Sequence, residues 1–227
     1  MTFKNFLISL FSLIIAGNAM AIEEPKFEQL SKDGNIEVRR YAPLIVAEVT
    51  VDGDMDAATN QGFRLIADFI FGNNRAAGAT AEKASDKIAM TAPVTAIPLP
   101  SKPAKTAIAM TAPVTAEPLA AEGESSMSAN RWRVHFVMPS QYSMANLPVP
   151  NNAAVTIREL PARTFAALVY SGFNGTTKVQ QRTDELMAWL KSKKLQALGS
   201  PQLSRYDAPW VLPMFRRNEI MVEISPQ

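Results

Sequence analysis

Apolar and polar residues alternate along several short stretches of the chain, whereas two longer stretches repeat apolar residues at intervals of three and four. Alternation is typical of strands with one buried face, and the wider spacing is typical of amphipathic helices. The predicted helices are residues 55–71, with Asp54 as N-cap and Gly72 just beyond the C-terminus, and residues 174–194. The predicted strands are residues 35–41, 44–51, 131–138, 154–159, 164–171, 202–206 and 218–224.

The order of these elements repeats along the chain. Strand, strand, helix, strand, strand runs through about 35–138 and again through about 154–224. We therefore expect an α+β fold in which a duplicated unit forms one antiparallel sheet, curled towards a barrel, with both helices packed outside. Residues 22–227 would form a single domain around one core.

A nearly identical segment occurs twice. Residues 88–99 read IAMTAPVTAIPL and residues 108–119 read IAMTAPVTAEPL, so that eleven of twelve positions match. Two copies are too few for a solenoid. The prolines between them favour a turn, and we expect the copies to form two arms of a long hairpin with Met90 and Met110 at equivalent places.

The first 21 residues have the features of a secretory signal peptide. Lys4 precedes an apolar run at 6–16, and Ala19-Met20-Ala21 fits the small-x-small cleavage pattern. The run is shorter than the roughly 20 residues that span a bilayer. Cleavage after Ala21 would leave 22 basic and 21 acidic side chains, and a periplasmic or secreted protein with no transmembrane segment. An uncleaved membrane anchor is the alternative.

The composition excludes several kinds of function. A formal net charge of +2 leaves no basic footprint for nucleic acid. Without cysteine there can be no disulfide, zinc-thiolate site or cysteine nucleophile. His135 is the only histidine, so the chain has no histidine cluster for a metal. We expect no enzymatic activity. Alternation in 131–138 places His135 opposite Trp132 and Phe136, on an exposed or rim position.

Several residues suit the binding of a flat apolar ligand. Methionine is soft and adaptable, so Met90 and Met110 could line a pocket, although they could equally fill the core. The helix 55–71 has a second apolar stripe that includes Phe63 and Ala67. Arg64 lies beside this stripe and could meet a ligand carboxylate, or be a solvated helix arginine.

A segment near the C-terminus concentrates aromatic residues, prolines and two arginines. Residues 206–220 read YDAPWVLPMFRRNEI. Tryptophan and phenylalanine in such a setting are usually buried. Arg216 and Arg217 could clamp a carboxylate, but pairing with Glu219 and neighbouring acids is the favoured interpretation.

Three segments resemble the SOUL haem-binding family. They are KIAMTAPV at 87–94, WRVHFVMPS at 132–140 and RRNEI at 216–220, and they come in the family's order. The resemblance runs from about residue 24 to 225. It implies a duplicated βαββ unit forming a distorted antiparallel barrel with two helices, and non-covalent binding of haem or a related porphyrin.

The resemblance also implies where the tetrapyrrole binds. It places the site in a cleft between the first helix and the MTAPV strand, which on this chain carries Phe63, Arg64, Ala67 and Met90, with Met110 as the duplicate of Met90. His135 stays a candidate axial ligand, at a position where the family does not require histidine. The alternative is a non-haem small-molecule sensor or a protein-interaction module that uses the same cleft or the long hairpin.

Overall fold

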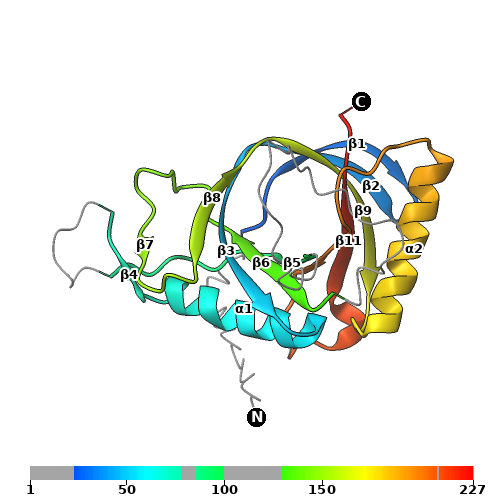
Figure 1. Ribbon diagram of the computed structural model, residues 1–227. Helices are drawn as coiled ribbons and strands as arrows, with labels where there is room; N and C mark the ends of the chain where they lie inside the picture. Colours follow the sequence, from blue (N-terminus) through cyan, green and yellow to red (C-terminus); the bar gives the residue numbers. More distant parts are fainter. Residues whose placement is uncertain (1–22, 78–84, 100–128, 209, 227) are drawn as a thin grey trace, which may run out of the picture.

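A nine-stranded antiparallel sheet curls into a half-barrel, and two helices lie on its outer side (Figure 1). The computed structural model describes residues 23–77, 85–99, 129–208 and 210–226. The strand order is β1-β2-β9-β11-β10-β5-β6-β3-β8, and β4 and β7 form a separate two-stranded sheet. The elements are β1 (Phe27–Asp33), β2 (Ile36–Tyr41), β3 (Leu44–Asp52), α1 (Met55–Ile70), β4 (Asn74–Arg75), β5 (Val94–Pro98), β6 (Arg131–Val137), β7 (Val149–Pro150), β8 (Thr156–Leu160), β9 (Arg163–Ser171), α2 (Thr176–Ser192), β10 (Gln202–Arg205), the short 3-10 helix η2 (Pro213–Phe215) and β11 (Arg217–Ile224).

The two halves of the chain exchange their first strands. In the large sheet, β2 pairs with β9 of the second half, and β8 pairs with β3 of the first half. The halves meet in the middle, where β5 pairs with β10. The α+β architecture and the curled antiparallel sheet are confirmed. That the halves arose by duplication stays a prediction.

Helix α1 covers the outer face of β3, β5 and β6. Its N-cap is Asp54, as predicted, since the side chain accepts a hydrogen bond from the Ala57 amide at 2.8 Å. Beyond its C-terminus Gly72 has a φ of 123°, a conformation that favours glycine. The core under α1 contains Ile66, Phe69 and Ile70 from the helix and Val49, Val51, Trp132, Val134 and Phe136 from the sheet, all buried.

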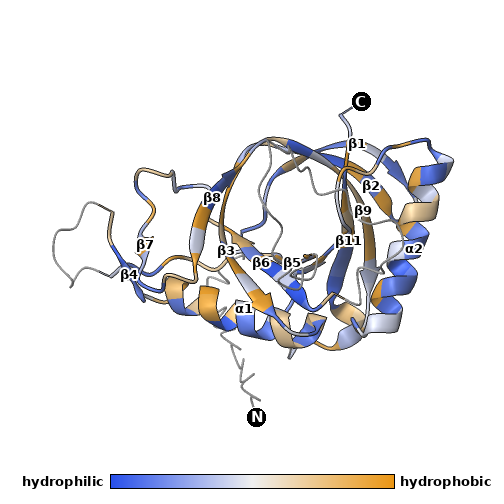
Figure 2. Cartoon of the chain, viewed as in Figure 1, coloured by the Kyte–Doolittle hydropathy of each residue, from blue (hydrophilic) through white to orange (hydrophobic). Residues whose placement is uncertain are grey.

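Helix α2 covers the outer face of β9 and β11. Val179, Leu186 and Leu190 are buried along the face of the helix that packs on the sheet. The half-buried Trp189 donates a hydrogen bond from its indole to Asp33 of β1 at 3.0 Å, which joins α2 to the edge strand. Hydrophilic residues occupy the outer side of α2 (Figure 2). The core is therefore one layer between the sheet and the two helices.

The structure departs from the sequence predictions in several places. Strand β1 was not predicted, because all but one of its residues are exposed and it shows little alternation. In the first copy of the repeat, the strand covers only Val94–Pro98 instead of the whole copy. The expected burial of the C-terminal aromatic residues is wrong, since Trp210 is 85% exposed and Phe215 is 71% exposed. The prolines of this loop keep it out of the sheet, so it has no partner strand to cover it.

Two predictions concern residues outside the described parts of the chain. They are the signal peptide at 1–21 and the second copy of the repeat at 108–119, which includes Met110. The long hairpin therefore stays a prediction. Among the described residues, no helix is long and apolar enough to cross a membrane.

The approach of α1 to β6 leads to a first prediction. A Cβ at Gly62 would lie 2.6 Å from the Cβ of Val134, an atom fixed to the strand backbone. We expect Gly62→Ala to lower the free energy of unfolding by about 1–3 kcal/mol through overpacking, although alanine favours a helix by about 1 kcal/mol. Urea unfolding measures this change. Gly199→Ala is the control, because a Cβ there meets nothing within 4 Å; equal effects of the two substitutions would contradict the close approach.

Candidate functional site: the inner face of the half-barrel

The inner face of the half-barrel carries polar as well as apolar residues, in contrast to the apolar face covered by the helices. Strands alternate in period two, so that on β6 Trp132, Val134 and Phe136 pack in the core while the residues between them face inwards. A row of polar residues crosses five strands, each the direct partner of the next: Glu48, His135, Thr95, Ser204 and Glu219. The hydroxyls of Thr95 and Ser204 lie 3.0 Å apart and share a hydrogen bond.

Two adjoining hollows open on this inner face. The inner pocket is about 120 Å³ in volume and is lined by His135, Thr95, Ser204 and the arginines Arg133, Arg158 and Arg163, together with apolar residues such as Phe165 and Met221. The mouth hollow, about 480 Å³, lies where β2 turns into β3 and where the chain leaves β6. It is lined by Leu44, Ile45, Met138, Tyr142 and Met144, among others. The hollows share Pro25, Ala42, Leu44 and Val137, so they lie side by side.

His135 is buried in the inner pocket. Only 7% of the residue is exposed, and its Nδ1 atom has no hydrogen-bond partner among the described residues. Burial, reinforced by the positive charges of Arg158, Arg133 and Arg163, lowers the pKa of His135 to about 4. The imidazole is therefore neutral at pH 7. The sequence correctly placed His135 away from the helix-covered core, but the expected exposure is wrong, because the curled sheet encloses its own inner face.

The arginines of the inner pocket outnumber the carboxylates that pair with them. Arg158 donates to Oε2 of Glu48 from both Nη2, at 2.8 Å, and Nε, at 3.2 Å. Nε of Arg133 lies 3.8 Å from Oε1 of the same carboxylate, which is beyond hydrogen-bond length. Arg163 donates to Glu223 at 3.0 Å. Three guanidinium groups thus share two carboxylates beside a neutral histidine.

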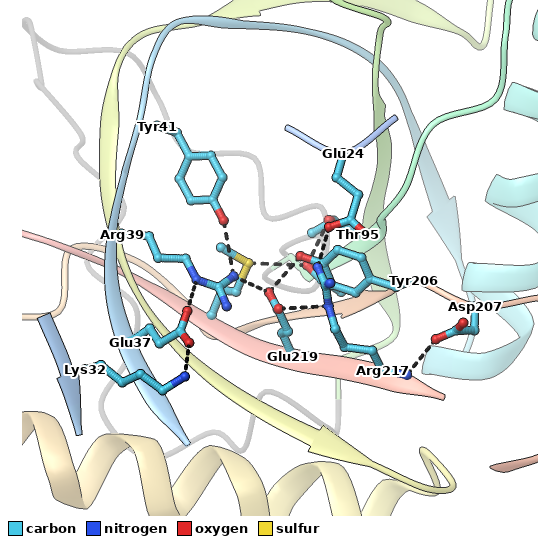
Figure 3. Close-up of polar contacts among 12 residues, drawn as sticks. Glu24, Lys32, Glu37, Arg39, Tyr41, Thr95, Tyr206, Asp207, Arg217 and Glu219 are labelled. Atoms are coloured by element: carbon cyan, nitrogen blue, oxygen red, sulfur yellow. Dashed lines mark hydrogen bonds and ion pairs between the residues drawn. The ribbon is translucent and has the colours of Figure 1, made fainter. Parts of the chain in front are cut away.

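A buried ion cluster forms the wall of the half-barrel next to the inner pocket (Figure 3). Arg39 donates to Glu219 and to Glu37, each at 2.8 Å, and the side chain of Glu219 is fully buried. Tyr206 donates its hydroxyl to Glu219 at 2.7 Å, and the guanidinium of Arg217 stacks on the Tyr206 ring at 3.6 Å. Burial first, then the Glu219 charge, raises the pKa of Tyr206 above its ordinary value.

The same region of the structure shows the partners of the two C-terminal arginines, Arg216 and Arg217. Nε of Arg217 lies 3.3 Å from Glu219, and its Nη2 pairs with Glu24 at 2.6 Å. Arg216 donates from Nε to the carbonyl of Val211 at 2.7 Å. The favoured pairing with acidic neighbours is confirmed for Arg217, whereas the Arg216 contact holds the exposed loop together.

The predicted ligand residues lie on the other face of the sheet. Phe63 is 37% exposed on α1, with its ring centroid 5.7 Å from that of Phe136. Arg64 is exposed, Ala67 is buried, and Met90 is half-buried against the core. None of these four lines the inner pocket or the mouth hollow. Ligand binding beside α1 stays a prediction, and Met110 lies outside the described residues.

The model of the SOUL heme-binding protein family matches residues 22–223, nearly the whole chain. This chain belongs to the SOUL family. A search of curated protein sequences gave no match. A metal ion held by protein side chains alone needs several donor residues close together. Among the described residues, no three histidine, aspartate or glutamate side chains are grouped in this way.

Several solved structures are similar to this SOUL-family chain. EcmrR in complex with DNA has a TM-score of 0.55 at 12% identity, over 85% of this chain and 57% of that chain. The EcmrR C-terminal domain has a TM-score of 0.52 at 12% identity, over 85% of this chain and 98% of that chain. A hydrolase from Listeria innocua has a TM-score of 0.50 at 10% identity, over 86% and 94%. At these identities the likeness concerns the fold alone.

The buried ion cluster leads to a second prediction. Arg39→Met would leave Glu219 and Glu37 without their shared partner in a buried setting. Breaking such a pair typically costs roughly 3–5 kcal/mol, and we expect a loss of this order in urea unfolding. Arg40→Met is the matched control, because Arg40 is exposed and pairs only at the surface with Glu28, so its loss should stay under about 1 kcal/mol.

The buried histidine leads to a third prediction. Since the folded-state pKa of His135 is about 4 against an ordinary 6.5, the unfolded chain binds the proton more readily. This contribution to stability is present above pH 6.5 and is lost as the pH falls towards 4. Between pH 7 and pH 5 it should reduce the free energy of unfolding by about 2 kcal/mol.

The measurement compares the native chain with His135→Asn in urea at both pH values. Carboxylates titrate in the two proteins alike, so the difference between their pH responses isolates the histidine. Parallel pH responses would show that His135 titrates in the folded protein as it does in the unfolded chain.

Proposed function

We propose that this SOUL-family protein binds haem or a related tetrapyrrole non-covalently, with the macrocycle in the mouth hollow. Family membership supports the class of ligand. The volume of about 480 Å³ supports the location, since ligand pockets typically measure roughly 300–1,000 Å³. The side chains of Leu44, Ile45, Met138 and Tyr142 would hold the ring, and burial of its apolar faces would supply most of the affinity.

The observation that carries the proposal is the junction between an apolar hollow and a cationic pocket. A tetrapyrrole such as haem combines a flat apolar ring with carboxylate arms. The mouth hollow offers apolar and methionine side chains, and the adjoining inner pocket offers guanidinium groups, which suit carboxylates. Both kinds of contact are thus available in two adjoining hollows.

An axial role for His135 does not fit this arrangement. The inner pocket that contains the imidazole is about 120 Å³, well below the size of a pocket for a macrocycle. A ring in the mouth hollow therefore stays outside the space that His135 lines. When bound, an iron tetrapyrrole would supply a redox-active metal centre, and the protein's residues would hold and orient the ring without this histidine as ligand.

The location of the protein and the kinds of function left out of the proposal are inferred from the sequence. The sequence pattern that predicts a signal peptide at 1–21 supports action in the periplasm or outside the cell. The proposal includes no catalytic step, no nucleic acid and no membrane span. A cleft beside α1, lined by Phe63, Arg64, Ala67 and Met90, is the competing location for the same ligand.

A fourth prediction tests both the ligand and its location. Haem titrated into the protein from residue 22 onwards should give a Soret change that saturates near one equivalent. Met144→Glu places a charge at an exposed position in the mouth hollow and should weaken binding at least tenfold. Met187→Glu, at an exposed position on α2, is the matched control and should bind as the native chain does.

The remaining variants separate the two locations. Phe63→Ala and Arg64→Ala should leave the titration unchanged, and His135→Asn should leave the haem spectrum unchanged. A loss confined to the Phe63 and Arg64 variants would move the site to α1. An absorbance rise without saturation in the native chain would exclude haem as a ligand.

A further inference from the structure

The inner pocket contains a buried polar atom that the protein itself leaves without a partner. Nδ1 of His135 is inaccessible to solvent and has no hydrogen-bond partner among the described residues. A buried polar group in this condition costs free energy, whereas its neighbours Thr95 and Ser204 satisfy each other across 3.0 Å. His135 lines the pocket, so its imidazole borders the space that a ligand would enter, although Nδ1 itself is closed to an atom the size of a water oxygen.

The charges around the pocket specify the kind of ligand. Arg133, Arg158 and Arg163 are opposed by Glu48 and Glu223, which leaves one positive charge in excess. Arg158 is engaged by two hydrogen bonds to Glu48, but Arg133 lies 3.8 Å from that carboxylate and keeps its donors for another acceptor. One planar monoanion balances this charge and matches the fork of a guanidinium.

The size of the pocket sets the size of the group that enters. A volume of about 120 Å³ is well below the roughly 300–1,000 Å³ of a typical ligand pocket, so the inner pocket suits a small group. That space admits a carboxylate with a short aliphatic stem, and apolar side chains such as Phe165 and Met221 are available for the stem. A phosphate would bring more negative charge than the single excess cation balances.

We infer that the inner pocket is a binding site for one carboxylate group, held by Arg133 beside the imidazole of His135. The carboxylate belongs either to a small free acid or to an arm of the ligand in the mouth hollow. The inference rests on the proposed function only in the second case, because a small acid would bind here whether or not a tetrapyrrole does. Arg158 and Arg163 complete the positive surroundings.

The single histidine makes the test direct. Sodium propionate is titrated at pH 7 into the protein from residue 22 onwards, and the imidazole resonances of His135 are followed by NMR. We expect a saturable shift with a dissociation constant in the millimolar range. Propionamide, which has the same shape without the charge, and sodium chloride at equal ionic strength should give no saturable shift.

Variants connect the shift to the pocket. Arg133→Met should weaken propionate binding at least tenfold. Arg131→Met is the matched control, because Arg131 is on the same strand and does not line the pocket; it should bind propionate as the native chain does. If near-UV circular dichroism shows that Arg133→Met does not fold, Arg158→Gln replaces it in the propionate titration and should also weaken binding. No saturable shift in the native chain, or equal binding by the Arg133 and Arg131 variants, would overturn the inference.

A second comparison identifies the source of the carboxylate. Protoporphyrin and its dimethyl ester are titrated into the native chain and into Arg133→Met, with quenching of tryptophan fluorescence as the readout. A preference for the free acid that disappears in Arg133→Met assigns the pocket to an arm of the tetrapyrrole. Equal binding of acid and ester, together with saturable propionate binding, assigns it to a small free acid. If no tetrapyrrole binds, the propionate titration still tests whether the inner pocket binds a carboxylate.

Discussion

The alternation of side chains along the strands is the constraint on which the rest of this structure depends. The strands beneath the helices must present an apolar face to α1 or α2, and period-two geometry then directs every other residue to the opposite face. In a flat sheet those residues would be solvated. Here the sheet curls on itself, so the polar face becomes the lining of an enclosed space. Burial of polar groups is thus a consequence of closing the sheet around its own inner face.

Enclosed polar groups need partners, and the two halves of the molecule meet this need differently. His135 on β6 and Glu219 on β11 hold corresponding places, each one strand away from the central pair of Thr95 and Ser204. Oε2 of Glu219 accepts hydrogen bonds from Arg39 and Tyr206, and its Oε1 lies 3.3 Å from Nε of Arg217 in an ion pair. Nδ1 of His135 has no such partner among the described residues. The space around Glu219 is therefore filled by the buried ion cluster, whereas the space around His135 forms the inner pocket.

Local patterns were sufficient to predict much of the fold. Helix spacing, the Asp54 cap and the alternation of β6 depend on residues close together in the chain, and all were read correctly. Strand β1 was missed because its exposed residues carry no alternation. The site depends on distant pairs: Arg39 meets Glu219 across 180 positions and Arg158 meets Glu48 across 110. A sequence pattern indicates which face His135 occupies, but not that the face is enclosed.

The adjoining hollows divide recognition into two separable parts. Apolar burial in the mouth hollow discriminates little between ligands, because any flat ring of suitable area is stabilised roughly in proportion to the apolar surface that it buries. The inner pocket is selective, because its excess positive charge favours a carboxylate over a neutral analogue of the same shape. Affinity for the ring and selection for the carboxylate would then reside in different residues. A substitution such as Arg133→Met can remove the selection while the hollow that holds the ring keeps its shape.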